Sequence, residues 1–239
     1  MIRFENVSFA YEKGKPVLSS VSFCVQTGEA IGLIGANGAG KSTIMKLLLG
    51  LEAPDSGTVS VDDVPVSPKT LPQIRRKLGY VLQNSDHQMF MPTVYEDMIF
   101  GLRNYGMSEP DADQRVNAVL ETLQLSSLKH AYNHQLSGGE KRMAAIATIL
   151  AMEPQVILMD EPSSALDPFN RRVIINTIRD LPQTKIITSH DLDMIYDTCH
   201  RVMVISRGRI TADGPAETIL HDRRLLEENH LELPLRFQN

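Results

Sequence analysis

Short apolar runs alternate with longer amphipathic stretches along most of this chain. Residues 2–11 and 17–26 alternate apolar and polar positions, which is typical of half-buried strands separated by a polar loop. Further strands are predicted at 30–35, 57–63, 79–83, 155–160, 184–189, 201–206 and 207–214, and the one at 79–83 is expected to be short and buried. Helical patterns follow several of these runs, near 41–49, 168–180 and 191–200. Because strands that alternate with helices form parallel sheets, we expect an α/β core with a mainly parallel sheet.

Residues 85–151 break this alternation, because they contain helical patterns in succession. We therefore predict a single domain over 1–239 with a helical subdomain, 85–151, inserted into a core formed by 1–84 and 152–221. The first strands are expected to form an antiparallel β subdomain, and residues 222–239 a short C-terminal tail.

Charge and composition narrow the classes of function. The formal net charge is −5, which disfavours nucleic acid as a partner because nucleic-acid binding usually requires a basic face. No apolar run reaches the ~18 residues of a membrane span, and the first residues lack the apolar centre of a signal peptide. Cys24 and Cys199 stand alone, without metal-ligand spacing. These features predict a cytosolic protein.

The sequence GANGAGKST follows the apolar run at 30–35 and opens a predicted helix. It fits the phosphate-binding pattern G-x-x-x-x-G-K-[ST], in which backbone N–H groups and a helix N-terminus hold phosphate oxygens. The lysine places a positive charge on the phosphates, and the serine offers a hydroxyl to Mg²⁺. We therefore predict a nucleoside triphosphate site at Gly35, Ala36, Asn37, Gly38, Ala39, Gly40, Lys41, Ser42 and Thr43.

A second candidate element, VILMDEP, is an apolar strand that ends in two carboxylates. Ligands of α/β proteins bind at the carboxyl ends of the strands, which would bring Asp160 and Glu161 to the phosphate loop. We expect Asp160 to hold Mg²⁺ and Glu161 to polarise an attacking water. The alternative is an acidic pair that simply begins a turn before Pro162.

The segment LSGGE (136–140) places two glycines where a long helix should begin. A serine and bare backbone N–H groups at a helix N-terminus can bind an anion. Since the chain already has a phosphate loop, Ser137, Gly138 and Gly139 would serve a nucleotide held by another copy, in a head-to-tail pair. The alternative is an ordinary capping box between Ser137 and Glu140.

With these motifs in this order, the chain resembles the ATP-binding cassette (ABC) ATPases over nearly its whole length. The segment 136–140, with glutamate instead of the commoner glutamine at its end, is similar to their signature. The resemblance implies that Tyr11 stacks on adenine, that Gln83 reaches Mg²⁺ and the attacking water, and that His190 contacts the γ-phosphate. It also places Asp167, in SALD, near the dimer seam. Alternatively, these could be an edge-packing tyrosine, a solvated glutamine and a structural histidine.

The stretch GYVLQNSDHQMFMPTVYEDMIFG (79–101) resembles energy-coupling-factor ATPases, and residues 181–214 are similar to the cobalt/nickel (CbiO-like) branch. This resemblance implies a homodimer or paired ATPases, contacting membrane subunits through 84–101. We expect an extended arm followed by an acidic helix start, Tyr95-Glu96-Asp97, to form a groove for a partner helix. The alternative is a surface loop with Phe90 buried.

The resemblance therefore predicts an ATPase that uses ATP and Mg²⁺ to drive an importer, most simply one for cobalt or nickel, on the cytoplasmic face of the membrane. A vitamin-type energy-coupling ATPase and a soluble ATPase of iron–sulfur assembly are the alternatives. Cassette ATPases of DNA repair and of the ribosome are disfavoured, because the chain has one cassette and no heptad repeat between 43 and 136.

Overall fold

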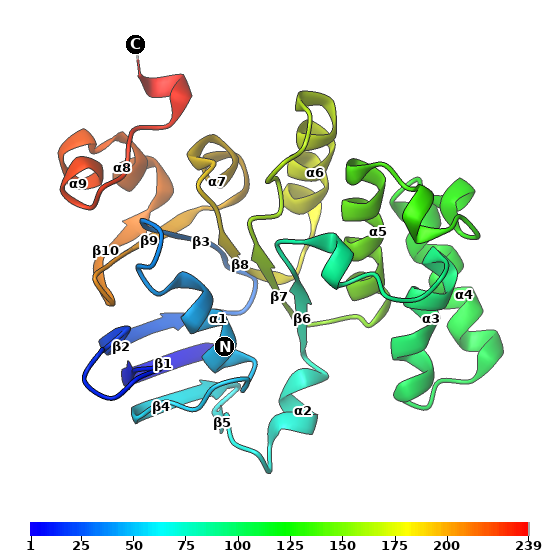
Figure 1. The fold of residues 1–239 in the computed structure, drawn as a ribbon, viewed down its shortest axis with the longest axis horizontal. Helices are drawn as coiled ribbons and strands as arrows, with labels where there is room; N and C mark the ends of the chain where they lie inside the picture. The colour runs from blue at the N-terminus through cyan, green and yellow to red at the C-terminus, as the bar shows by residue number, and fades with distance from the viewer. Residues whose placement is uncertain (239) are drawn as a thin grey trace.

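The fold contains two β-sheets and a separate layer of helices (Figure 1), seen in a computed structural model that describes residues 1–238. The smaller sheet is antiparallel, with the strand order β2-β1-β4-β5. Its strands are β1 (Ile2–Phe9), β2 (Leu18–Val25), β4 (Ser56–Val61) and β5 (Val64–Pro65). This arrangement confirms the predicted antiparallel β subdomain at the N-terminus.

The larger sheet has six strands in the order β10-β9-β3-β8-β7-β6. All neighbouring pairs are parallel except β10 and β9, so the predicted mainly parallel sheet is confirmed. Every residue of β3 and β8 is buried, as expected for central strands of a parallel sheet covered on both faces. The strands are β3 (Ala30–Ile34), β6 (Leu78–Val81), β7 (Val156–Asp160), β8 (Thr184–Thr188), β9 (Arg201–Ser206) and β10 (Arg209–Pro215).

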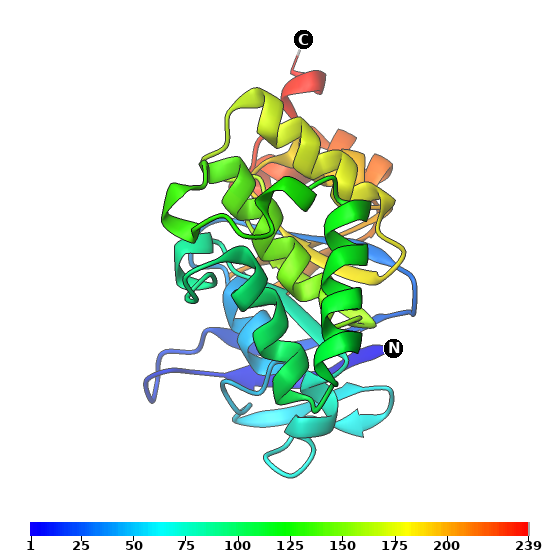
Figure 2. The same cartoon turned by 90° about the vertical axis from the view of Figure 1, so that its right-hand side faces the viewer.

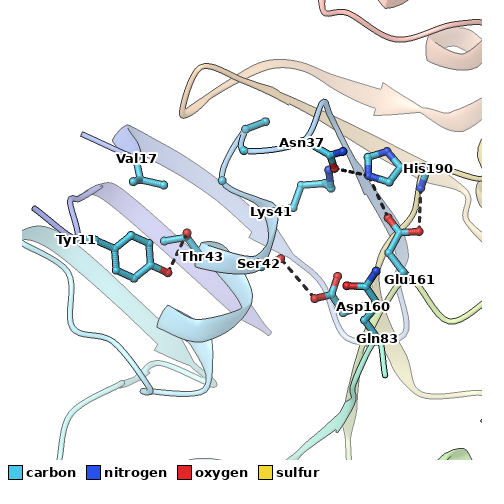
Figure 3. Close-up of a pocket in the computed structure, with 13 residues that line it drawn as sticks. Tyr11, Val17, Asn37, Lys41, Ser42, Thr43, Gln83, Asp160, Glu161 and His190 are labelled. Atoms are coloured by element: carbon cyan, nitrogen blue, oxygen red, sulfur yellow. Dashed lines mark hydrogen bonds and ion pairs between the residues drawn. The ribbon is translucent and has the colours of Figure 1, made fainter. Parts of the chain in front are cut away.

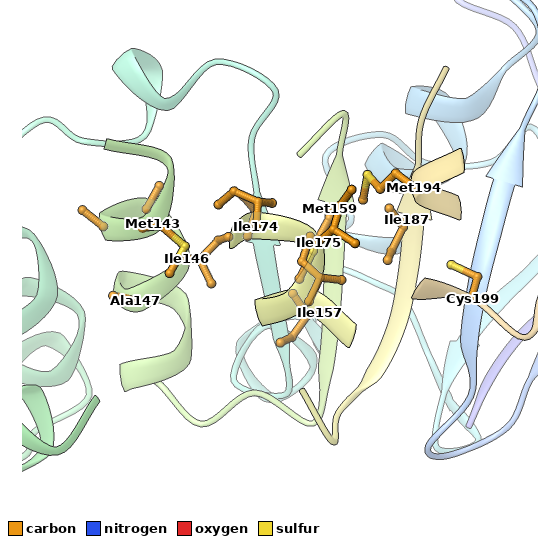
Figure 4. Close-up of a cluster of buried hydrophobic side chains, with 14 of the residues drawn as sticks. Met143, Ile146, Ala147, Ile157, Met159, Ile174, Ile175, Ile187, Met194 and Cys199 are labelled. Carbon is orange, nitrogen blue, oxygen red and sulfur yellow. The ribbon is translucent and has the colours of Figure 1, made fainter. Parts of the chain in front are cut away.

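Two apolar clusters hold the sheets in place. One cluster joins the antiparallel sheet, one face of the larger sheet and the helix α1 (Lys41–Leu48), with Ile44 and Leu48 fully buried. The other lies on the opposite face of the larger sheet, where side chains of α6 (Pro168–Asp180) and α7 (Leu192–Thr198) pack on β7 and β8 (Figure 4). The larger sheet is therefore covered on both faces.

Residues 85–151 form helices on one side of the sheets (Figure 2). The helices are α3 (Val94–Asn104), α4 (Glu109–Thr122) and α5 (Gly138–Ala151), with short 3-10 helices at Ser85–His87, Ser126–Leu128 and Asn133–Gln135. The position of these helices agrees with an inserted unit, and the subdomain boundaries themselves stay a prediction. No helix in residues 1–238 is both long and apolar enough to cross a bilayer.

Besides the 3-10 helices, the sequence did not predict β5, α2 (Leu71–Arg75), α8 (Ala216–His221) and α9 (Arg223–Glu228). The last of these lies in the segment expected to be a tail. That segment packs on the domain, because Leu226 is fully buried and the Arg236 guanidinium lies 2.7 Å from Asp193 and 2.8 Å from Asp197 in α7.

The expectation of an extended arm and an acidic, partner-facing helix start is wrong in two respects. A 3-10 helix interrupts the arm at Ser85–His87, and Asp97 is only 3% exposed. Its carboxylate accepts hydrogen bonds from the backbone N–H groups of Phe90 and Met91, both at 3.1 Å, and from the Asn133 side chain. Burial raises the pKa of Asp97, against the effect of these bonds. Asp97 therefore stabilises the arm from within the subunit, and a partner cannot reach it.

Candidate active site

A cleft of about 340 Å³ opens at the carboxyl edge of the larger sheet (Figure 3). Separate segments contribute to its wall: the loop after β3, the start of α1, the ends of β6, β7 and β8, and the loop after β1. The cleft brings together most of the residues predicted from the sequence, and it adds Val17, which precedes β2 and carried no motif. Its lining residues are Tyr11, Val17, Asn37, Gly38, Ala39, Gly40, Lys41, Ser42, Thr43, Gln83, Asp160, Glu161 and His190.

The predicted phosphate loop wraps the N-terminus of α1, where the helix dipole favours an anion. Gly40 begins this helix with φ 116°, and a Cβ there would lie 2.7 Å from Cδ2 of Leu18. Only glycine fits that position without strain. The Lys41 ammonium donates to the carbonyls of Gly35 at 2.6 Å and Ala36 at 3.2 Å. Gly35 and Ala36 thus support the lysine, and they are absent from the lining of the cleft.

Lys41 is 8% exposed, and burial lowers the pKa of its ammonium. The charges of Glu161 and Asp160 oppose part of this change. A buried cation whose hydrogen-bond acceptors are neutral carbonyls is suited to bind an incoming anion, because the anion recovers electrostatic energy lost on burial.

Asp160, the last residue of β7, is held on both of its carboxylate oxygens. The Thr188 hydroxyl donates to Oδ1 at 2.5 Å, and the Tyr80 hydroxyl donates to Oδ2 at 3.3 Å. Burial and the neighbouring carboxylate raise the pKa of Tyr80, so this hydroxyl keeps its proton. Ser42 Oγ lies 3.4 Å from the same Oδ2 atom, which places a hydroxyl and a carboxylate side by side at the start of α1.

These oxygens fit a magnesium site. Mg²⁺ prefers hard oxygen ligands, and it commonly takes one or two from the protein and the rest from phosphate and water. Ser42, Asp160 and the Gln83 amide all line the cleft. The structure holds no group of three or more His, Cys, Asp or Glu side chains suited to a metal within residues 1–238. The chemistry that Mg²⁺ would supply here is neutralisation of phosphate charge.

Glu161 has an unusual backbone and an unusual side chain. Its φ of 48° lies in the left-handed region, which costs roughly 1–3 kcal/mol for a non-glycine residue and is concentrated at functional sites. Oε2 accepts from the Ser189 hydroxyl at 3.2 Å and from the His190 backbone N–H at 3.1 Å. Oε1 is buried and has no hydrogen-bond partner among the described residues, although Nε2 of His190 lies 3.6 Å away. This oxygen is therefore not held by a protein donor within residues 1–238, unlike Oε2.

His190 joins two loops across the cleft. Its Nε2 lies 2.8 Å from Oδ1 of Asn37, which is in the phosphate loop. The side chain is about half exposed, so it is not a structural histidine buried in the core. An imidazole at this point can hydrogen-bond to a ligand that the phosphate loop holds.

Tyr11 lies at the other end of the cleft, half exposed. Its ring forms a perpendicular pair with the ring of Phe9, with 4.8 Å between the ring centres, so the ring packs in part on its own subunit. The Lys46 ammonium donates to its hydroxyl at 3.2 Å and lies 5.2 Å from the ring centre. Its hydroxyl is also 3.4 Å from Thr43 Oγ1, so Tyr11 is fixed beside the start of α1. An aromatic ring held in this way can stack on a planar base.

The signature residues lie outside this cleft. Ser137 caps α5 and forms the capping box with Glu140, so this alternative reading holds locally. A Cβ on Gly139 would lie 2.3 Å from the Asn170 side chain, and Asn170 in turn donates to Asp167, the N-cap of α6. A Cβ on Gly138 would meet nothing within 4 Å. The subunit itself therefore explains Gly139 and leaves Gly138 unexplained.

Comparison with known proteins identifies the family. The family described as ABC transporter matches residues 18–164, which is more than half of the chain. The chain belongs to the ABC transporter ATPases. The ABC transporter ATP-binding protein GSU1281 of Geobacter sulfurreducens, described as putative, is 43% identical over all of this chain and 96% of its own length. The energy-coupling factor transporter ATP-binding protein EcfA of Methanothermobacter thermautotrophicus is 40% identical over 98% of this chain and 77% of its own.

Solved structures show the same fold. CbiO1 from Clostridium perfringens, described as part of the ABC transporter complex cbiONQ, matches with a TM-score of 0.86. It is 31% identical, over 95% of this chain and 93% of its own. The bacterial cassette MJ0796, solved as a dimer bound to ADP and Pi, matches with a TM-score of 0.80 at 27% identity, over 90% and 99% of the two chains. The present chain is therefore an ATP-hydrolysing cassette of the energy-coupling factor type, and it belongs to a family whose cassettes dimerise.

The buried position of Lys41 leads to a test of the phosphate loop. We expect Lys41→Ala to weaken ATP binding by about tenfold or more, because the ammonium is the one buried cation lining the described cleft. Titration of the purified variant with a fluorescent ATP analogue measures this loss. Lys69→Ala, at an exposed lysine, is the control. Unchanged ATP affinity in Lys41→Ala would exclude Lys41 from the nucleotide site.

Proposed function

We propose that this cassette powers an energy-coupling factor importer for cobalt or nickel ions, on the cytoplasmic face of the membrane and peripheral to it. The similarity to EcfA and to CbiO1 along nearly the whole chain supports the class of transporter. The resemblance of residues 181–214 to the cobalt/nickel branch supports the substrate. The observation that carries the catalytic part is Glu161 in the wall of the cleft, whose Oε1 has no hydrogen-bond partner among the described residues.

In the proposed reaction, ATP lies with its base on Tyr11 and its phosphates in the loop 35–43. Lys41 neutralises the β- and γ-phosphates, and Ser42, Asp160 and Gln83 hold Mg²⁺. Oε1 of Glu161 accepts a proton from the attacking water, and His190 holds the γ-phosphate. The geometry supports these roles, because Oε2 of Glu161 is already occupied by two donors and Nε2 of His190 lies close to Oε1.

We further propose that the active unit is a head-to-tail pair, either of two copies or of this chain with a second cassette. Each ATP would be held by the loop 35–43 of one subunit and sealed by Ser137, Gly138 and Gly139 of the other. Two observations support this: these residues lie outside the cleft of their own subunit, and the space beside Gly138 is open. Asp167 accepts a hydrogen bond from Asn170, whose side chain lies against Gly139, so Asp167 would also lie at the interface between the two subunits.

The region 84–101 is proposed as the contact with membrane subunits. Phe90 is 64% exposed and Phe100 is 41% exposed, and their rings pack edge-to-face at 5.1 Å. The alternative in which Phe90 is buried is therefore wrong. An exposed aromatic pair is typical of an interaction surface. Phe90 lies in the segment that leads on from Gln83, which lines the cleft, so this segment connects the surface to the cleft along the chain.

Replacing the proposed base tests the hydrolysis mechanism. We expect Glu161→Gln to slow ATP hydrolysis by about 10²–10⁴-fold, because the amide cannot accept the proton of the attacking water. The variant should still bind ATP and should accumulate as an ATP-bound dimer. Phosphate release and light scattering measure the two effects. Turnover within threefold of the wild type would remove Glu161 from this role.

The open space beside Gly138 tests the head-to-tail pair. We expect Gly138→Ala to leave the stability of the isolated chain unchanged or to raise it by up to about 1 kcal/mol, because alanine favours a helix. ATP-driven dimer formation and hydrolysis should fall at least tenfold, because the new methyl group occupies the approach of the second subunit. Urea denaturation and ATPase assays of the same preparation separate the effects. Full activity in a stable variant would argue against the pair.

Purification from membranes tests the transporter assignment. We expect integral membrane subunits to co-purify with the wild-type chain and to be lost from the variant Phe90→Ser/Phe100→Ser. Tyr105→Ser, at an exposed aromatic elsewhere on the helical layer, should retain them. Soluble scaffold proteins in their place would favour iron–sulfur assembly. Uptake of radioactive cobalt or nickel by the reconstituted complex tests the substrate, and uptake of a vitamin instead would contradict it.

A further inference from the structure

Arg142 is a buried cation near the start of α5, and its environment is unusual. The side chain is 5% exposed, and burial lowers its pKa. Its guanidinium donates to two backbone carbonyls, from NH1 to Leu82 at 2.6 Å and from NH2 to Gln83 at 2.5 Å. Nε has no hydrogen-bond partner among the described residues. The acceptors of this charge are thus neutral carbonyls of the segment that follows β6.

Stability alone does not account for an arginine here. Its neighbours Met143, Ala144 and Ala145 are buried and apolar. A buried charge costs several kcal/mol in desolvation, and well-packed apolar side chains often replace such charges without loss of stability. What an apolar residue cannot do is bind two consecutive carbonyls. The guanidinium is a rigid planar fork, so it fixes the orientation of the peptide groups on both sides of Gln83.

Other contacts attach the same segment, residues 82–88, to α5. Gln88 accepts from the backbone N–H of Leu82 at 3.0 Å and donates to the carbonyl of Ala145 at 2.8 Å. Lys141 forms a salt bridge with Asp86. Although residues 82–88 continue a strand of the sheet, they are therefore bound to α5 through Arg142, Gln88 and Lys141.

We propose that Arg142 is a positioning residue that aims Gln83 into the catalytic cleft and makes residues 82–88 move together with α5. Gln83 lies beside Asp160 at the wall of the cleft (Figure 3), and the peptide groups that Arg142 binds determine the direction of its side chain. The inference rests on the proposed function, in which Gln83 contacts Mg²⁺ and the attacking water. The proposal adds a direct connection from α5, the helix that begins in the signature segment, to Gln83.

A double-mutant cycle tests this connection. Arg142→Met keeps an unbranched apolar side chain at this position and removes the guanidinium donors. We expect it to lower kcat about 5–20-fold while KM for ATP changes less than twofold. In a Gln83→Ala background, the same change should lower kcat less than twofold further, because the residue that Arg142 positions is gone. Arg115→Met, which breaks a salt bridge to Glu153 far from the cleft, should leave kcat unchanged. Arg142→Lys should be intermediate, since one ammonium cannot hold both carbonyls equally.

A second measurement distinguishes the loss of this local contact from a general effect on folding. In the folded Arg142→Lys variant, hydrogen exchange of the backbone amides of 82–88 should accelerate about tenfold while those of β7 stay protected. Any of three results would overturn the inference. They are normal kcat in Arg142→Met, a reduction of kcat in the double variant equal to the product of the two single reductions, and unchanged hydrogen exchange in 82–88. If Gln83→Ala is slow and Arg142→Met is not, only this inference fails. If Gln83→Ala turns over normally, the role proposed for Gln83 fails as well.

Discussion

The alignment of parallel strands in the larger sheet is the constraint on which the site depends. Leu33, Thr188 and Asp160 lie at one level, because the register pairs Leu33 with Thr188 and Thr188 with Asp160. The segments that leave these strands therefore begin side by side, and they carry the phosphate loop, His190 and Glu161. If β7 shifted by one residue, Asp160 and Glu161 would each point to the side of the sheet opposite to the present one. The apolar packing on both faces of the sheet thus fixes the positions of the polar groups.

The polar groups at this edge are held at a cost in stability. Lys41 is buried with carbonyls as its acceptors, Glu161 adopts a left-handed backbone, and one of its oxygens lacks a hydrogen bond within the described residues. Each feature is unfavourable by itself, and the Lys41 charge and the Glu161 oxygen are left without a charged or hydrogen-bonding partner of their own. Two covered sheet faces give the domain the stability to tolerate them.

The sequence predicts the parts of this protein whose physics is local. Short apolar runs bounded by turn residues are typical of buried strands, and the pattern of glycines and a lysine at a helix start is typical of a phosphate loop, so the core strands and the loop 35–43 could be located from the sequence. Short elements such as α2 and α9 have too few residues for a periodic pattern. Asp97 and Arg142 were missed for another reason: their partners Asn133 and Leu82 lie far away in the sequence, and an acid or a base near a helix start usually indicates a surface position.

The Asn170 side chain connects the start of α5 to the start of α6. Its amide fills the space in which a side chain at position 139 would stand, and it is itself fixed by the carboxylate of Asp167. The first turns of α5 and α6 therefore meet through one amide group. In the proposed pair, a second subunit would meet these two turns, which come from distant parts of the chain, already arranged side by side, and binding would not have to order them.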